Sequence, residues 1–238
     1  MRGTIASIVS SGAESLGVAL PPGAALAFEE YYVLLEERRQ FVNLTAITGA
    51  EEVARLHFLD SLALMGSARF KGARVIDIGS GAGFPGIPLK IAEPSVDITL
   101  LDSTGKRVAF LKELCAALGL DANCLHARAE AAAHLPGLRE AFDIAVSRAV
   151  ARLDALCELC LPFVRVGGLF IAMKGADSDD EIAGARAAIA ALGAELQELV
   201  DYGIPGADAA HRAVVMRKTS GTPEKYPRRF ARIQKAPL

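Results

Sequence analysis

The sequence is short of the residues that build metal or disulfide frameworks. Its 238 residues include no tryptophan and four cysteines, of which only Cys157 and Cys160 are spaced like a ligand pair. A zinc site needs a second cysteine or histidine pair, and none is placed to complete it. We expect both thiols to stack on one face of a buried helix, with redox or metal chemistry as the alternative. No metal site is predicted.

Long apolar runs are also missing. No stretch of 18 apolar residues occurs, which excludes a membrane-spanning helix. The first residues, MRGTIASIVSSGAESLG, are interrupted by serine, glycine and glutamate, so they do not resemble a secretory signal. We therefore expect the protein in the cytoplasm.

The sequence also lacks a large excess of acidic or basic residues. The 26 basic and 28 acidic residues give a net charge of −2, which excludes a uniformly basic nucleic-acid coat. Hydrophobic residues make up 52%, too many for a disordered chain, and the length suffices for a large core. Basic residues still gather at the end, where Glu224 is the only acid, and they allow phosphate contact at one edge. They are Lys218, Lys225, Arg228, Arg229, Arg232 and Lys235.

The first 68 residues lack strand-like runs. Apolar and aromatic residues recur at helical spacing from Phe28 to Leu35. Thr48-Gly-Ala-Glu51 matches a capping box and predicts a further helix that runs to about Met65. We expect residues 1–68 to form a helical N-terminal cap.

From Ala73 onward, short apolar runs alternate with amphipathic stretches, which indicates βαβ units and a parallel sheet covered on both faces. The last two strands have no helical pattern between them, so they should pair as an antiparallel hairpin. We predict an α/β domain with a mostly parallel seven-stranded sheet over residues 69–220, and a basic tail over residues 221–238. Five βα units followed by a hairpin along the chain are typical of a Rossmann-like class I methyltransferase, whereas a dinucleotide dehydrogenase continues with βα units. The predicted strands are Arg74–Ile78, Asp97–Leu101, Asn123–His126, Asp143–Val146, Leu169–Met173, Leu196–Tyr202 and Ala213–Arg217.

The sharpest local pattern is the turn Val75-Ile-Asp-Ile-Gly-Ser-Gly-Ala-Gly-Phe-Pro-Gly86. Glycine is needed where the backbone takes a positive φ or a ligand approaches closely. The Gly79-x-Gly81-x-Gly83 spacing is typical of a loop around S-adenosylmethionine, while Gly81-x-Gly83-x-x-Gly86 fits a dinucleotide loop. A tight turn without a ligand is the third interpretation. No Gly-Lys-Ser/Thr is present, which excludes a P-loop.

Two further strand ends carry candidate nucleoside contacts. Asp102 ends the second strand, 19 residues after Gly83, where a carboxylate accepts both ribose hydroxyls. Its alternative role is to cap the helix that begins near Lys106. Ala129 and Glu130 follow the third strand, where such sheets contact adenine, although a plain helix start has the same pattern.

The fourth strand ends in Val146-Ser147-Arg148, the position of the reacting group in this class of fold. The Asn/Asp-Pro-Pro-aromatic motif of amine methylation and the Pro-Cys nucleophile of cytosine methylation are both absent. Arginine cannot act as a base at neutral pH, but its planar fork binds carboxylates, phosphates or purine edges. The pattern permits a nucleophile that carries no proton, such as guanine N7, for which alignment suffices.

Two polar groups have competing interpretations. His57, Asp60 and Ser61 share one helix face, where they either cover the pocket or form a polar cluster that ties the cap to the sheet. The acidic run Asp177–Glu181 resembles a metal site, but we favour a role at a helix N-terminus, where the dipole stabilises acids.

Several segments occur in an order that is typical of one family. They are Asn43–Ile47, His57–Leu62, Val75–Leu89, Leu101–Ser103, Lys106-Arg107, Ser147–Ala149 and Lys174-Gly175. The Gly-Phe-Pro-Gly-Ile-Pro extension and the His-x-x-Asp-Ser element are more specific than a glycine loop alone. With these segments, the sequence resembles the bacterial 16S rRNA guanine-N7 methyltransferases, also called glucose-inhibited division protein B, over residues 25–220.

The resemblance implies methylation of N7 of the guanine at position 527 of 16S rRNA, with S-adenosylmethionine as cofactor. The implied partner is the small ribosomal subunit or its precursor; no obligate protein partner is expected, and the protein should act as a monomer. Arg148 and Lys174 are the expected catalytic residues, Arg148 through orientation and electrostatics without a general base. Cofactor contacts are expected from Gly79, Ser80, Gly81, Gly83, Phe84, Asp102, Ser103, Ala129, Glu130 and Arg148. RNA contacts are expected from Asn43, His57, Lys174, Arg228 and Arg229.

Three other functions stay open on the sequence. They are a methyltransferase acting on a small molecule, an NAD-dependent oxidoreductase that uses Gly81, Gly83 and Gly86, and a non-catalytic RNA-binding or ribosome-assembly factor. The basic tail favours the rRNA enzyme over the small-molecule enzyme, and the C-terminal hairpin favours it over the oxidoreductase.

Overall fold

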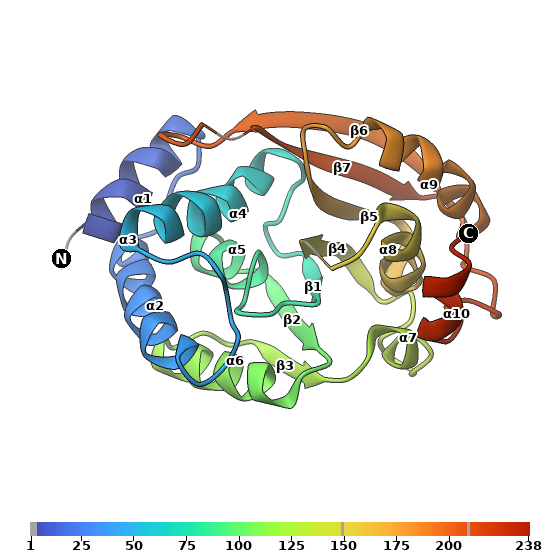
Figure 1. Cartoon of the computed structure of the whole chain (residues 1–238), viewed down its shortest axis with the longest axis horizontal. Coiled ribbons are helices and arrows are strands. Elements are labelled where there is room, and N and C mark those ends of the chain that lie inside the picture. Colours follow the sequence, from blue (N-terminus) through green and yellow to red (C-terminus); the bar gives the residue numbers. More distant parts are fainter. Residues whose placement is uncertain (1–3, 149, 209) are drawn as a thin grey trace.

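A seven-stranded sheet runs through the molecule, with the strand order β3-β2-β1-β4-β5-β7-β6 (Figure 1). The computed structural model describes residues 4–148, 150–208 and 210–238; Ala149, the last residue of the Ser147–Ala149 motif, lies outside the described residues. Strands β1 to β5 are parallel, and β7 is antiparallel to both β5 and β6. The predicted fold, including the C-terminal antiparallel hairpin, is confirmed. The strands are β1 Arg74–Ile78, β2 Asp97–Asp102, β3 Asn123–His126, β4 Phe142–Arg148, β5 Val164–Gly175, β6 Ala194–Gly203 and β7 Ala210–Lys218.

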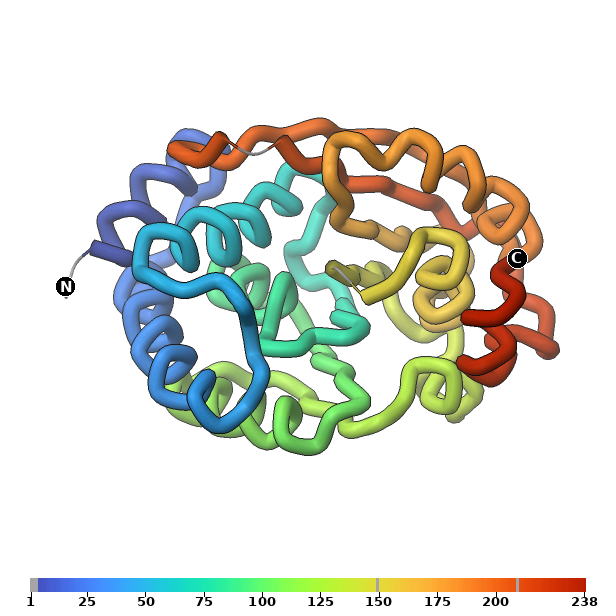
Figure 2. The backbone as a smooth tube through the Cα atoms, in the orientation of Figure 1, coloured from blue at the N-terminus to red at the C-terminus, as the bar shows by residue number. Residues whose placement is uncertain are grey.

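Helices cover both faces of the sheet, with the N-terminal helices in blue on one side and the C-terminal helix in red on the other (Figure 2). None of the helices in the described ranges is both long and apolar enough to cross a bilayer. The α-helices are α1 Thr4–Ser15, α2 Ala24–Arg39, α3 Ala50–Val53, α4 Asp60–Ala63, α5 Gly86–Ala92, α6 Gly105–Ala117, α7 Ala129–Ala132, α8 Leu153–Cys160, α9 Asp179–Ala191 and α10 Phe230–Lys235.

The core has two parts because side chains alternate across each strand. In β1, Val75 packs with the N-terminal helices and with α5 and α6, while Ile76 faces the other side, against α8 and α9. Tyr31 on α2 is fully buried and donates a hydrogen bond to the carbonyl of Ala82 in the glycine loop, at 2.6 Å. The helical N-terminal segment therefore shares one core with the sheet, and its boundary near residue 68 stays a prediction.

The helix expected from the capping box at Thr48 begins later than predicted. Helix α3 begins at Ala50 with Gly49 as its N-cap, and no side chain caps it. Gly49 has a φ of 90°, a left-handed conformation that places Thr48 outside the helix. The helix then passes through a π-helical turn, Ala54–Leu59, before α4. Such turns often occur at functional sites, and this one carries His57.

The two clustered cysteines are core residues. Cys157 and Cys160 lie on α8 with no exposed area, and burial raises the pKa of both thiols. The thiol of Cys157 lies 3.7 Å from the sulfur of Met216. Across the residues that the structure describes, no three metal-binding side chains gather into a site. The acidic run supplies the first turn of α9, after Ser178 as N-cap.

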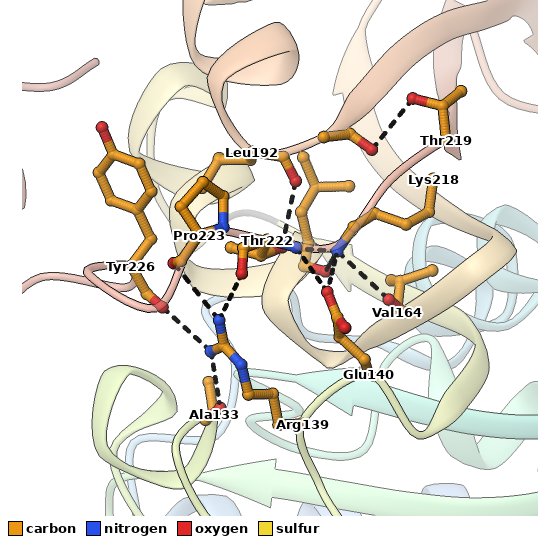
Figure 3. Close-up of polar contacts among 12 residues, drawn as sticks. Ala133, Arg139, Glu140, Val164, Leu192, Lys218, Thr219, Thr222, Pro223 and Tyr226 are labelled. Carbon is orange, nitrogen blue, oxygen red and sulfur yellow. Dashed lines mark hydrogen bonds and ion pairs between the residues drawn. The ribbon is translucent and has the colours of Figure 1, made fainter.

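The C-terminal segment packs onto the body of the protein. Lys218 is 1% exposed and donates to Glu140 and to the hydroxyl of Thr222. From the neighbouring loop, Arg139 donates to three backbone carbonyls of the segment, at Thr222, Pro223 and Tyr226 (Figure 3). These contacts attach the segment at its start.

A second anchor corrects the interpretation of the tail as a row of phosphate contacts. Arg228 donates to both carboxylate oxygens of Glu158, which has no exposed area, and this hydrogen bond raises the pKa of Arg228. Further along, Ile233 of α10 is fully buried in the core. Lys218 and Arg228 are thus held within the protein: Lys218 is itself buried and pairs with the partly exposed Glu140, and Arg228 neutralises the buried carboxylate of Glu158. The exposed basic residues of the segment are Lys225, Arg229, Arg232 and Lys235.

We predict that Arg228→Ala lowers the free energy of unfolding by about 3 kcal/mol, because it leaves Glu158 charged and buried without its partner. Arg229→Ala, which removes the exposed neighbour, should change stability by less than about 0.5 kcal/mol. Urea denaturation of the two variants measures the difference. Equal effects of the two substitutions would show that the Glu158 pair does not hold the segment.

Candidate functional site

The glycine loop between β1 and α5 is the centre of the site. Gly79 and Gly83 have φ values of 74° and 105°, which favour glycine over any residue with a side chain. A Cβ atom at Gly83 would lie 2.6 Å from the Tyr31 hydroxyl, so the loop also fits tightly beneath α2. Ser80 is buried and donates to the carbonyl of Asp77, which makes it a support of the loop.

Asp77 holds the far end of the same loop. Its Oδ2 accepts a hydrogen bond from the backbone N–H of Gly86 at 2.9 Å, and its side chain is fully buried. Burial raises the pKa of Asp77 to about 7, against the opposing effects of that hydrogen bond and of the Arg148 charge. We did not select Asp77 from the sequence, although a carboxylate inside an apolar strand was a visible signal.

Asp102 holds the middle of the loop and the start of α6. Its Oδ2 accepts from the N–H of Gly81 at 3.0 Å and its Oδ1 from the N–H of Thr104 at 2.8 Å. Arg107 lies 3.7 Å from Oδ2. The geometry fits the alternative role, a support at a helix start, and ribose binding would require Asp102 to exchange one of these partners.

A cavity of about 190 Å³ lies at the carboxyl ends of β1, β2 and β3. Four of the predicted cofactor residues line it: Gly79, Ser103, Ala129 and Glu130. Its volume is below the roughly 300 Å³ of pockets that enclose a drug-sized ligand, so it suits one end of a cofactor. Phe230 from the C-terminal segment also lines this cavity. We did not expect this contact from the sequence.

A larger cavity of about 580 Å³ lies at the carboxyl ends of β4 and β5, against the N-terminal helices. It joins residues that are far apart in the sequence. Predicted residues His57, Arg148 and Lys174 all line it. The other lining residues are Ile47, Leu56, Asp60, Met173, Gly175 and His211.

Arg148 is the hub of the larger cavity. Its Nη1 donates to Asp60 Oδ2 at 3.0 Å and to the carbonyl of Leu56 at 3.1 Å, and its Nη2 contacts His57 Nδ1 at 2.9 Å. The guanidinium also lies over the ring of Phe84, 4.9 Å from its centroid. His57 and Asp60 therefore tie the N-terminal helices to β4 and line the cavity at once, so both proposed roles of this pair are present together.

His57 is neutral in this arrangement. Burial and the Arg148 charge lower the pKa of His57 to about 3. Its Nδ1 then accepts from Arg148, and its Nε2–H donates to the hydroxyl of Thr45 at 2.7 Å. The imidazole stacks on Phe84 with ring centroids 4.4 Å apart. Phe84 is buried beneath His57 and Arg148, so a contact of its ring with the cofactor stays a prediction.

Asp60 has three partners although it is 2% exposed. Besides Arg148, its Oδ1 accepts from His211 Nδ1 at 2.7 Å and from the Tyr202 hydroxyl at 3.0 Å. Burial acts to raise the pKa of Asp60, but the hydrogen bond from His211 and the Arg148 charge outweigh it and lower the pKa. The hydrogen bond to Asp60 in turn raises the pKa of His211. We missed His211 and Tyr202, because only strand pairing brings the hairpin beside the N-terminal helices.

The remaining predicted residues fall into two groups. Lys174 lines the larger cavity, but its ammonium donates to Glu181 at 2.7 Å and to the carbonyl of Ala151 at 2.8 Å. Asn43 is exposed, and its carbonyl accepts from Arg107. Direct RNA contact by Lys174 therefore requires release from Glu181, whereas Asn43 and Arg229 are accessible.

The fold is that of the class I methyltransferases. A methyltransferase from Pyrococcus furiosus matches 81% of this chain and 98% of its own, with a TM-score of 0.57 and 10% identity. An S-adenosylmethionine-dependent methyltransferase from Aquifex aeolicus covers 69% of this chain and 92% of its own, with a TM-score of 0.53 and 16% identity. At such identities the likeness concerns the fold.

The family follows from the sequence comparisons. Residues 25–208 match the model of the family described as rRNA small subunit methyltransferase G. A relative of that name from Pelotomaculum thermopropionicum is 45% identical over 98% of this chain and 99% of its own. The chain belongs to the rRNA small subunit methyltransferase G family.

We predict that Asp77→Asn changes the pH dependence of stability. A folded pKa of about 7 lies above the ordinary 3.8, so the protonated form stabilises the protein below pH 4 and this stability is lost as the pH rises to about 7. The loss amounts to about 4 kcal/mol. The free energy of unfolding of the variant, measured by urea denaturation, should therefore rise relative to that of the parent protein between pH 4 and pH 7. Asp97→Asn, at the exposed start of β2, is the control; parallel profiles for the parent and the Asp77 variant would show that Asp77 does not titrate there.

Proposed function

We propose that this enzyme transfers the methyl group of S-adenosylmethionine to N7 of the guanine at position 527 in 16S rRNA. Methyl transfer from S-adenosylmethionine to rRNA follows from the family; the atom and the position are our proposal. The partner is then the small ribosomal subunit or its precursor, met in the cytoplasm, and the enzyme acts as a monomer.

The observation that carries the proposal is the chemistry of the larger cavity. Both nitrogens of neutral His57 and both oxygens of Asp60 are engaged within the network. Lys174 is paired with Glu181, and Asp60 favours the protonated form of His211. Among the described residues of this cavity, none is thus a free base. A nucleophile that must lose a proton is poorly served here, whereas guanine N7 offers a lone pair and loses none.

Methyl transfer to guanine N7 requires neither a general acid nor a general base. The bond between sulfur and the methyl carbon breaks, the bond between N7 and that carbon forms, and the positive charge moves from the sulfonium to the purine. Arg148 has five N–H groups, three of which are engaged within the chain. Its remaining donors can orient the purine edge.

The test is transfer of a tritiated methyl group to small ribosomal particles that lack the modification, compared with naked 16S rRNA and free nucleosides. Label in guanine N7 at position 527 of the particles is expected. Label in another base would refute the position, and label in free nucleosides alone would support a small-molecule substrate. Absence of label with tight RNA binding would support an assembly factor.

We predict that Arg148→Ala abolishes this transfer, with a smaller effect on folding, because His211 still neutralises Asp60. Arg165→Ala removes another paired arginine, at the opposite end of the sheet, and is the matched control. Initial rates and circular dichroism of both variants measure the effects. Turnover by Arg148→Ala near that of the control would remove Arg148 from the reaction.

The exposed basic residues of the C-terminal segment are the proposed phosphate contacts. Replacing Arg229, Arg232 and Lys235 together by alanine should weaken RNA binding and reduce the slope of log affinity against log salt by about 2. Lys71→Ala with Arg165→Ala, at the other end of the sheet, should leave the slope unchanged. An unaltered slope in the triple variant would mean that these residues touch no phosphate.

A further inference from the structure

The C-terminal segment supplies one wall of the smaller cavity. Phe230, the first residue of α10, lines this cavity together with Ala129 and Glu130, about one hundred residues earlier in the chain. Arg128 also lines this cavity, and its guanidinium lies over the Phe230 ring, with the central carbon 4.8 Å from the ring centroid. Phe230 is only half-buried, so part of the ring remains available to a ligand.

The position of Phe230 is set from both sides along the chain. Two residues before it, Arg228 is paired with buried Glu158. Three residues after it, Ile233 is fully buried beneath α8. Further back, Arg139 binds the carbonyls at Thr222 and Tyr226, as Figure 3 shows. Anchors this close leave little freedom to the residue between them, so Phe230 is a preorganised part of the cavity.

His134 adds a contact that links the cavity wall to the segment. Its Nε2 lies 3.0 Å from the carbonyl of Pro227, and His134 follows α7, the helix that begins with Ala129. The helix expected to contact adenine and the segment that carries Phe230 are therefore joined directly.

We propose that Phe230 stacks on the adenine of S-adenosylmethionine, so that residues 221–238 contribute one wall of the cofactor-binding site. This inference rests on the proposed function, since it takes the smaller cavity as the adenine end of the cofactor site. An aromatic ring at such a wall binds the π-face of a purine, and Arg128 on the ring favours one fixed orientation. The segment then serves the cofactor through Phe230 and RNA through its exposed basic residues.

The test measures affinity for S-adenosylhomocysteine by calorimetry. Phe230→Ala should weaken binding about tenfold, the size expected for loss of one stacked base. Phe230→Tyr keeps the ring and should bind within about twofold of the parent protein. Gln234→Ala, an exposed position on the same helix, is the matched control. In turnover, Phe230→Ala should raise the KM for S-adenosylmethionine with little change in kcat, because stacking is equal in ground and transition states.

A fluorescent variant keeps the proposal testable if Phe230→Ala unfolds. The chain has no tryptophan, so Phe230→Trp places a single reporter in the wall, and Gln234→Trp places one beyond it. Adenosine-containing ligands should quench the first and leave the second unchanged. Equal emission changes in the two, or an unaltered affinity of Phe230→Ala, would overturn the role of Phe230. If the parent protein itself does not bind S-adenosylhomocysteine, the proposed function fails instead.

Discussion

The ion pair between Arg148 and Asp60 is the interaction on which the site depends. It joins the end of the central strand β4 to the start of α4 among the N-terminal helices, and both side chains are largely withdrawn from water. Burying two charges is costly, and their attraction offsets that cost only when the remaining hydrogen-bonding groups are satisfied. His211, Tyr202 and His57 supply those partners. Three regions of the chain must therefore be in place before the larger cavity has its shape.

The same pair explains why the described residues of the larger cavity include no free base. Burial and the neighbouring guanidinium lower the pKa of His57 to about 3, and the guanidinium also occupies the Nδ1 lone pair. A carboxylate that already accepts three side-chain hydrogen bonds is a poor proton acceptor. What remains is an oriented, positively charged edge in an open cavity. Catalysis by such a site consists of alignment and electrostatic preorganisation. This suits a nucleophile with an exposed lone pair.

Basic residues of the C-terminal segment have two different roles, which their number alone does not reveal. The six basic residues from Lys218 to Lys235 looked alike in the sequence, yet Lys218 is buried and pairs with Glu140, and Arg228 neutralises the buried carboxylate of Glu158. The Arg228 pair holds the segment against α8, two residues before Phe230, which lines the smaller cavity. The exposed residues of the same segment point to solvent, next to the site. One short stretch can thus support the cofactor and approach RNA without any conflict between the two roles.

The sequence by itself determined the fold class, the succession of strands and helices along the chain, and the glycine loop, because hydrophobic periodicity and glycine spacing are local properties. It also indicated Arg148 and His57, whose motifs are short and specific. Only the tertiary structure decided what each side chain touches. Asp102 supports a loop, Lys174 pairs with Glu181, and His211 reaches Asp60 from a strand 151 residues away. Such contacts depend on which strands become neighbours and on which charges burial leaves in need of a partner, and no local pattern encodes either.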